Sequence, residues 1–276
     1  MMHSRNPVLS REDAFVPAGH QSNPYQQGNQ FDPHPGGQGY QAPQPQDGGR
    51  MTIEDVITKT AITMLVMMAS AAALFFGVET GMIPMTGALI AMAAGGLITF
   101  ILSLVVAFRR SVSPALVIPF AIFEGLFVGG ISWLFEQNYP GIVASAVLGT
   151  FVAAAVVLAS YKFFNIKVTP RFRRIIFCAT LGFAVAALLN FVLSLFGINL
   201  GLRDGGTGPV SMIAVGFSLL GAILASLNLI LDFDYVEQGI RDGAPAKASW
   251  KAAFGLTVTL VWLYVEILRL LSYLRR

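Results

Sequence analysis

Residues 114 to 135 read PALVIPFAIFEGLFVGGISWLF, an apolar run that contains a single carboxylate, Glu124. At a rise of about 1.5 Å per residue, about 20 residues cross the roughly 30 Å hydrocarbon core of a bilayer. This run therefore predicts a membrane-spanning helix with an acidic side chain near its middle.

Runs of similar length recur along the chain, which has 55% hydrophobic and only 12% charged residues. A mean hydropathy of +0.66 is far from that of a water-soluble domain. Backbone groups in lipid must be satisfied internally, so we expect an all-α membrane protein, a bundle of seven transmembrane helices over residues 51–276. The predicted spans are 61–79, 86–108, 114–135, 141–164, 174–197, 209–234 and 250–273.

The first 50 residues have a different composition, rich in Gln, Pro and Gly and poor in aliphatic side chains. Such a segment buries too little apolar surface to offset its ordering entropy, so we expect a disordered tail. An alternative interpretation is a docking arm for a membrane protein partner, because Tyr25, Phe31 and Tyr40 punctuate the polar background.

Cations are concentrated in alternate loops, which predicts that the tail is cytoplasmic. The net charge of +3 therefore indicates membrane orientation, and nucleic acid is not an expected partner. Only Arg203 and the terminal Arg275 and Arg276 fall on the other side. The cations on the predicted cytoplasmic side are Arg50, Lys59, Arg109, Arg110, Lys162, Lys167, Arg171, Arg173, Arg174, Arg241, Lys247 and Lys251.

Small residues recur at helical spacing, which predicts close approach of helix backbones. The pairs are Gly125 with Gly129, Ala91 with Gly95, and Gly182 with Ala186.

Acidic residues within the spans are the candidate functional sites, because a buried carboxylate is costly in lipid. Glu124 is expected either in an ion or proton pathway or as a protonated, hydrogen-bonded acid. Asp232 and Asp234, followed by Glu237, close the sixth span, where carboxylates oppose the helix dipole. They form either a solvated helix end or a site compensated by a cation, a loop arginine or a shared proton.

Glu266 is the acid of the seventh span, with Arg269 three residues later. Either the two form a local ion pair, or Glu266 faces the acids of the sixth span, where two close carboxyls would make a proton-sensitive latch.

Histidines occur only at positions 3, 20 and 34, in the tail, and the glycine loop of ATP-driven pumps is missing. We therefore expect no enzyme activity, no resident metal and no cofactor.

Three segments resemble the Bax inhibitor-1 family, the transmembrane Bax-inhibitor-motif proteins, in a bacterial branch. They are Phe233-Asp234, Leu263-Tyr264-Val265-Glu266-Ile267-Leu268-Arg269-Leu270-Leu271, and Glu124-Gly125-Leu126-Phe127-Val128-Gly129. The resemblance covers about 60 to 276.

The resemblance implies a pH-sensitive calcium leak in the bacterial plasma membrane, with an acidic pair between the sixth and seventh helices as proton sensor. Asp234 and Glu266 match that pair, with glutamate at the second position, and Asp232 is a rival partner. With straight helices Glu266 would lie about 20 Å deeper than Asp234. Contact would require the sixth helix to extend past 234 and the seventh to enter the lipid late.

Two other functions stay open. One is a non-catalytic regulator that binds a membrane protease or another membrane complex through the tail, and the other is a proton-coupled transporter.

Overall fold

The computed structural model describes residues 49–109, 111–164, 168–198, 200–202 and 211–275. The predicted tail therefore lies outside the described residues except for Gly49 and Arg50, as do Arg110, Lys167, Arg203 and Arg276. The described ranges form seven α-helices. These are α1 (Ile53–Glu79), α2 (Met85–Phe108), α3 (Pro114–Asn138), α4 (Ile142–Phe163), α5 (Pro170–Leu195), α6 (Met212–Arg241) and α7 (Ala248–Leu274).

All seven helices are long and apolar enough to cross a membrane, which confirms the predicted fold class. α1 begins eight residues before the predicted span, with the Thr52 hydroxyl accepting from the Asp55 N–H at 3.2 Å and acids in the first turn. The predicted sixth span ends at 234, but α6 continues to Arg241. The polar segment after Asp234 is therefore also helical. Gly243, with φ of 66°, then ends the helix in the left-handed conformation.

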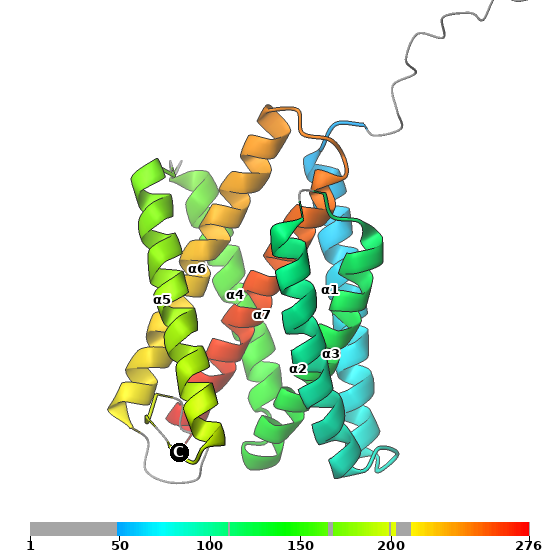
Figure 1. Ribbon diagram of the computed structural model, residues 1–276, viewed down its shortest axis with the longest axis vertical. Coiled ribbons are helices and arrows are strands. Elements are labelled where there is room, and N and C mark those ends of the chain that lie inside the picture. The colour runs from blue at the N-terminus through cyan, green and yellow to red at the C-terminus, as the bar shows by residue number, and fades with distance from the viewer. Residues whose placement is uncertain (1–48, 110, 165–167, 199, 203–210, 276) are drawn as a thin grey trace, which may run out of the picture. The chain divides into compact units, whose positions relative to one another are not determined.

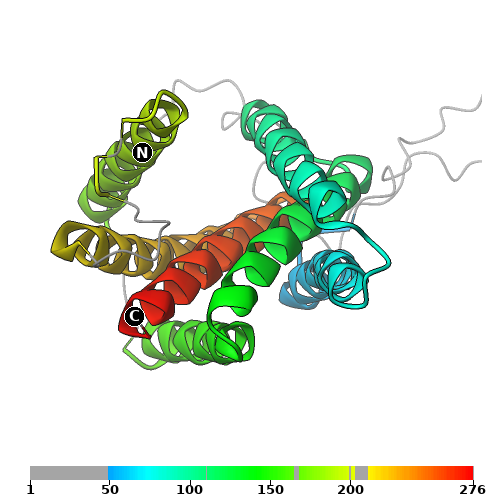
Figure 2. The same ribbon diagram turned by 90° about the horizontal axis from the view of Figure 1, so that it is seen from below.

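α7 lies at the centre of the bundle and packs against α1, α3, α4 and α6. Figure 2 shows it crossing the middle, with α1 to α3 on one side and α5 and α6 on the other. α2 packs mainly on α3, and α5 mainly on α6, so these two helices are peripheral. Many outward side chains are apolar, among them Ile90, Phe100 and Leu188, as expected of a surface that faces lipid.

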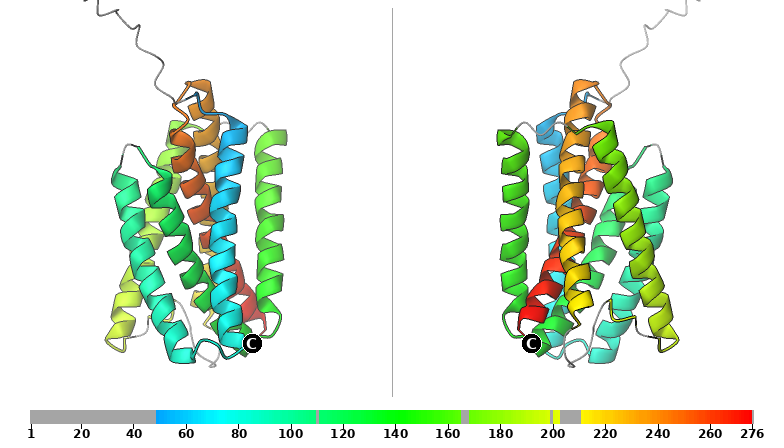
Figure 3. Two further views of the ribbon diagram at one scale, coloured as in Figure 1. Left: turned by 90° about the vertical axis from the view of Figure 1, so that its right-hand side faces the viewer. Right: turned by 90° about the vertical axis from the view of Figure 1, so that its left-hand side faces the viewer.

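The starts of α1, α3, α5 and α7 and the ends of α2, α4 and α6 lie at one end of the bundle (Figure 1). We call this the N-terminal end, and the views from both sides in Figure 3 show the C-terminus at the opposite end. There Arg275 donates to the Pro140 carbonyl at 2.9 Å and to the Ser145 hydroxyl at 3.2 Å. Arg275, one of the few cations on the side of the membrane that the loop charges predict to be external, therefore attaches the end of α7 to the start of α4.

Residues 49–51 pair with the α6–α7 loop. The Met51 N–H donates to the Ala244 carbonyl and the Ala246 N–H donates to the Gly49 carbonyl, each at 2.7 Å. Met51 is only 2% exposed and its sulfur lies against Gly239 of α6. The point where the tail joins the bundle is therefore tied to the hairpin that carries Asp232 and Asp234.

Small residues allow α3 to touch two helices. A Cβ at Gly125 would lie 2.3 Å from the Met67 carbonyl oxygen of α1, and one at Gly129 would lie 2.5 Å from that of Ala71. On α2, a Cβ at Gly95 would lie 2.8 Å from the Phe123 carbonyl oxygen of α3. The predicted close packing is confirmed here. It is wrong for Gly182, because none of the described residues comes within 4 Å of an added Cβ there.

Candidate functional site

Asp234 lies near the N-terminal end of the bundle, 7% exposed, in the last third of α6. Its Oδ2 accepts from Arg173 Nη2 at 2.7 Å and from Gln238 Nε2 at 2.6 Å. Thr169 caps the start of α5, which places Arg173 in the first turn beside α6. Of the compensations expected for this carboxylate, the structure therefore provides an arginine.

Glu237 lies one turn beyond Asp234 on α6, and its Oε2 accepts from the Tyr161 hydroxyl of α4 at 2.5 Å. Together with the Arg173–Asp234 contact, this hydrogen bond connects the ends of α4, α5 and α6. The predicted cluster is thus part of an interhelical network and differs from a simple solvated helix end.

Asp232 belongs to a different contact. Its Oδ2 accepts from the Thr259 hydroxyl of α7 at 2.6 Å, and its Oδ1 lies 3.6 Å from the position of a Cβ at Gly255. It lines a cavity of about 220 Å³ that also includes Lys251 and Tyr235. Asp232 and Asp234 therefore point to different neighbours although they are two residues apart.

Glu266 is completely buried, with 0% exposure, in the second half of α7. Its neighbour on α6 is Gly221, where an added Cβ would lie 2.8 Å from the Glu266 Cδ and 2.7 Å from the Phe183 ring. A glycine at 221 therefore makes the space that the glutamate occupies.

Arg269 is partly buried one turn after Glu266. Within the described part of the chain, its Nη1 has no hydrogen-bond partner. The sequence indicated Arg269 as a candidate ion-pair partner for Glu266. The described contacts do not show which residue its guanidinium binds.

Asp234 and Glu266 are not brought together, and the predicted carboxyl latch between them is wrong. Glu266 lies level with Gly221, which precedes Asp234 by 13 residues on α6, a rise of about 20 Å. The same register pairs Asp232 with Thr259, so Asp232 is not the partner of Glu266 either. The short α6–α7 loop makes the two helices antiparallel and fixes their register. Asp234 lies close to this loop along α6, whereas Glu266 lies far from it along α7, so the two carboxyls lie at different depths in the bundle.

Glu124 lies in α3 and is also buried, next to Thr99 of α2. Among the residues that the structure describes, no three His, Cys, Asp or Glu side chains come together as metal ligands usually do. The acids are thus separate points distributed along the bundle.

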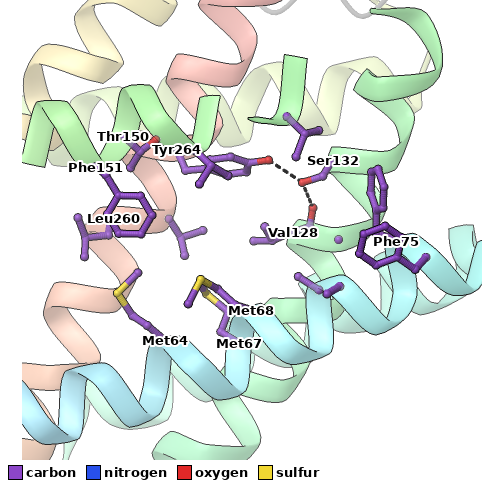
Figure 4. A pocket seen from close by; sticks show the side chains of 17 residues that line it. Met64, Met67, Met68, Phe75, Val128, Ser132, Thr150, Phe151, Leu260 and Tyr264 are labelled. Carbon is purple, nitrogen blue, oxygen red and sulfur yellow. Dashed lines mark hydrogen bonds between the residues drawn. The ribbon is translucent and has the colours of Figure 1, made fainter. Parts of the chain in front are cut away.

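A separate, apolar pocket contains none of these acids. It lies between α1, α3, α4 and α7 and has a volume of about 280 Å³. Figure 4 shows Met64, Met67 and Met68 of α1 directed toward Leu260 and Tyr264 of α7. The Tyr264 hydroxyl meets the Ser132 hydroxyl at 2.7 Å.

Sequence reasoning missed the partners of the acids. Arg173 entered only as one of several loop cations, and Thr259, Gln238 and Tyr161 were not singled out. The i+4 spacing of Asp234 and Gln238 was a signal that could have been found, whereas contacts between helices required their packing.

Comparison with known proteins identified one family. The model of a family described as Bax inhibitor 1 like matches residues 6–276, a longer match than the predicted 60–276 because it includes most of the tail. No curated protein matched the chain.

Proposed function

Since this chain belongs to the Bax inhibitor 1-like family, we propose that it is a pH-sensitive leak for cations, with calcium as the main permeant ion. The protein is an integral membrane protein, and its described residues form seven apolar helices that are long enough to cross a membrane. We place it in a bacterial plasma membrane with the N-terminal end in the cytoplasm, in accord with the loop cations.

The complete burial of Glu266 is the observation on which the proposal rests. A carboxyl in the membrane interior costs about 2.5–3.5 kcal/mol on insertion scales, which makes a functional role the default interpretation. Glu266 lies on α7, the helix that contacts four others, so a change in its charge acts at the centre of the bundle.

Glu124, Glu266 and Asp232 supply oxygen ligands at separate positions. Hard cations such as calcium prefer carboxylate and carbonyl oxygens, and conduction requires binding weak enough for the ion to leave. Single carboxylates at separate positions fit a leak better than a cage of several acids, which would hold the ion. The proposal includes no catalytic step and no cofactor.

The Arg173–Asp234 ion pair takes the place of the carboxyl latch as the proton-sensitive contact. A charged hydrogen bond is about twice as strong as a neutral one, so protonation of Asp234 weakens its attachment to Arg173. Because α5 packs mainly on α6, loss of this contact frees α5 at the N-terminal end.

Calcium flux into proteoliposomes over a pH series tests the proposal. Asp234→Asn cannot form the ion pair, so we expect faster flux at neutral pH and a flatter pH profile. Glu266→Gln replaces the central carboxyl with an amide and removes one oxygen ligand, so we expect slower flux. Glu54→Gln, at an exposed site in the first turn of α1, is the matched control and should behave as wild type. If both buried-site variants keep the wild-type rate and profile, the leak mechanism is wrong.

A second candidate function, regulation of a membrane complex through the tail, is favoured by one observation. Residues 49–51, which follow the tail in the chain, are paired with Ala244 and Ala246 of the α6–α7 loop. Deletion of residues 1–46 discriminates between the two candidates. A leak keeps its flux after this deletion, whereas a tail-dependent regulator loses its partner in a pull-down from membranes.

A further inference from the structure

The apolar pocket between α1, α3, α4 and α7 is a groove with space for a ligand, and we call it the α1–α4 groove. It has a volume of about 280 Å³ and is lined by Met64, Met67, Met68, Val147, Val261 and Tyr264, among others. We propose that the groove binds one acyl chain of a membrane lipid. This inference is independent of the proposed leak.

The groove offers a ligand almost only hydrocarbon. Its side-chain polar groups are the hydroxyls of Ser132, Thr150 and Tyr264. Ser132 donates to the Val128 carbonyl at 2.6 Å, Thr150 donates to the Ala146 carbonyl at 2.7 Å, and Tyr264 meets Ser132. Since each hydroxyl already has a partner within the bundle, the groove gives water little to bind, and an apolar occupant is favoured.

The groove opens toward the lipid between α1 and α4. Met68 and Phe76 on α1 and Phe151 on α4 line it and are at least 40% exposed. Its back is formed by α7, where Val261 is only 6% exposed. Figure 3 shows α7 behind the space between α1 and α4. The medium at this opening is the acyl chains of the bilayer, so they need cross no polar barrier to enter.

The dimensions fit one chain of one leaflet. Along α1 the lining runs from Met64 to Phe76, a length of about 18 Å at 1.5 Å per residue. Half of a hydrocarbon core of about 30 Å is about 15 Å. A long, narrow space of this kind suits a chain better than a compact ligand.

The position of the lining residues selects the leaflet. Met64 is near the middle of α1, while Phe76 is close to its end, and Val143 is close to the start of α4. The groove therefore extends from the centre of the bundle to the end opposite the N-terminal end. The bound chain belongs to a lipid of that leaflet, with its terminal methyl near Met64 and its carbonyl near Phe76.

Three methionines line the inner part of the α1 wall of the groove, next to Ala71 and Ala72. Met64, Met67 and Met68 have flexible, polarizable side chains that fill irregular spaces and tolerate different partners. We therefore expect the groove to accept acyl chains that differ in length and unsaturation.

Photochemical labelling in vesicles tests the proposal. The full chain is reconstituted in phosphatidylethanolamine and phosphatidylglycerol with a phosphatidylcholine whose acyl chain carries a mid-chain diazirine. After irradiation, adducts are located by mass spectrometry of peptides. We expect adducts on Val261 and Leu260 at the back of the groove, where only a chain that enters can reach. Lack of labelling there, with labelling of the outward-facing Phe100, would overturn the proposal.

Substitution at the opening provides the second measurement. Ala72→Trp places an indole in the groove, so adducts on Val261 should be lost while those on Phe100 persist. Ala73→Trp, at the next exposed position, does not line the groove and should label as wild type. Val147→Trp fills the groove from α4 and serves if the first variant does not fold. Unchanged labelling of Val261 in a folded, groove-filling variant would contradict a bound chain.

Two further probes test the leaflet. A diazirine near the carbonyl should label the Phe76 and Val143 end, and one near the terminal methyl should label Met64. If the carbonyl probe labels neither Phe76 nor Val143 while the terminal probe still labels Met64, the chain comes from the other leaflet and that part of the proposal is refuted.

Discussion

Arg173 and Asp234 join the first turn of α5 to the last third of α6, with 2.7 Å between Nη2 and Oδ2. The carboxylate is almost completely buried, whereas the arginine side chain is 52% exposed. The two residues are thus unequal partners, because loss of the arginine leaves a buried charge and loss of the aspartate releases a solvated one.

We expect Arg173→Gln to lower the free energy of unfolding by about 1–3 kcal/mol, the range for a group left without a charged hydrogen bond. Half of the arginine is in contact with solvent, which places the effect toward the lower end. Thermal unfolding in nanodiscs measures it, and Arg171→Gln, an exposed arginine of the same turn, is the control. A double-mutant cycle with Asp234→Asn should show coupling, and strictly additive effects would contradict a direct pair.

Tyr264→Phe should lower the free energy of unfolding by about 0.5–1.5 kcal/mol, the usual net value of one hydrogen bond. Ser132 donates its only hydroxyl hydrogen to the Val128 carbonyl, so Tyr264 is the donor in the contact at 2.7 Å between the two hydroxyls. The substitution therefore leaves no buried donor without an acceptor. Tyr235→Phe, at a side chain that is 47% exposed, should change the unfolding temperature much less.

The sequence was sufficient for the fold because lipid imposes a strong constraint on length and polarity. The predicted span 114–135 and the observed α3, Pro114–Asn138, begin at the same residue. The end of α6 was less predictable, because a helix that leaves the membrane loses its apolar pattern while keeping its hydrogen bonds. The predicted span therefore stopped at Asp234, although the helix runs to Arg241.

The acids were identified from the sequence, but their partners were not. Counting residues indicated that Glu266 would lie about 20 Å deeper than Asp234, and the register of α6 against α7 agrees with this separation. The hypothesis of a carboxyl pair required a change in helix register to overcome this separation, and the structure does not bring the two carboxyls together. The Arg173–Asp234 contact spans 61 residues along the chain and depends on which face of α5 packs on α6, which composition does not reveal.

Gly129→Ala should lower the free energy of unfolding by about 1–3 kcal/mol, the usual cost of overpacking. The added methyl would lie 2.5 Å from the Ala71 carbonyl oxygen and 2.9 Å from its Cα, and backbone atoms cannot move aside without displacing α1. Gly182→Ala is the matched control, because its added methyl meets nothing within 4 Å. That control should stabilise α5 by about 0.5–1 kcal/mol, since alanine is the better helix former. Equal effects of the two substitutions would show that α1 and α3 are not in close contact.

Met51→Ala should destabilise the N-terminal end by about 2 kcal/mol or more, the lower range for a buried methionine replaced by alanine. Met51 is 2% exposed, and its sulfur would lie 3.0 Å from a Cβ at Gly239, so its side chain fills the space between the incoming chain and α6. Hydrogen exchange of the Met51 and Ala246 amides reports on this contact directly, because both donate to carbonyls across the same junction. Both amides should exchange faster in the variant, while Met82→Ala, at a side chain that is 77% exposed, should leave them unchanged. Exchange at the wild-type rate in Met51→Ala would mean that the backbone pairing holds the junction without help from the methionine.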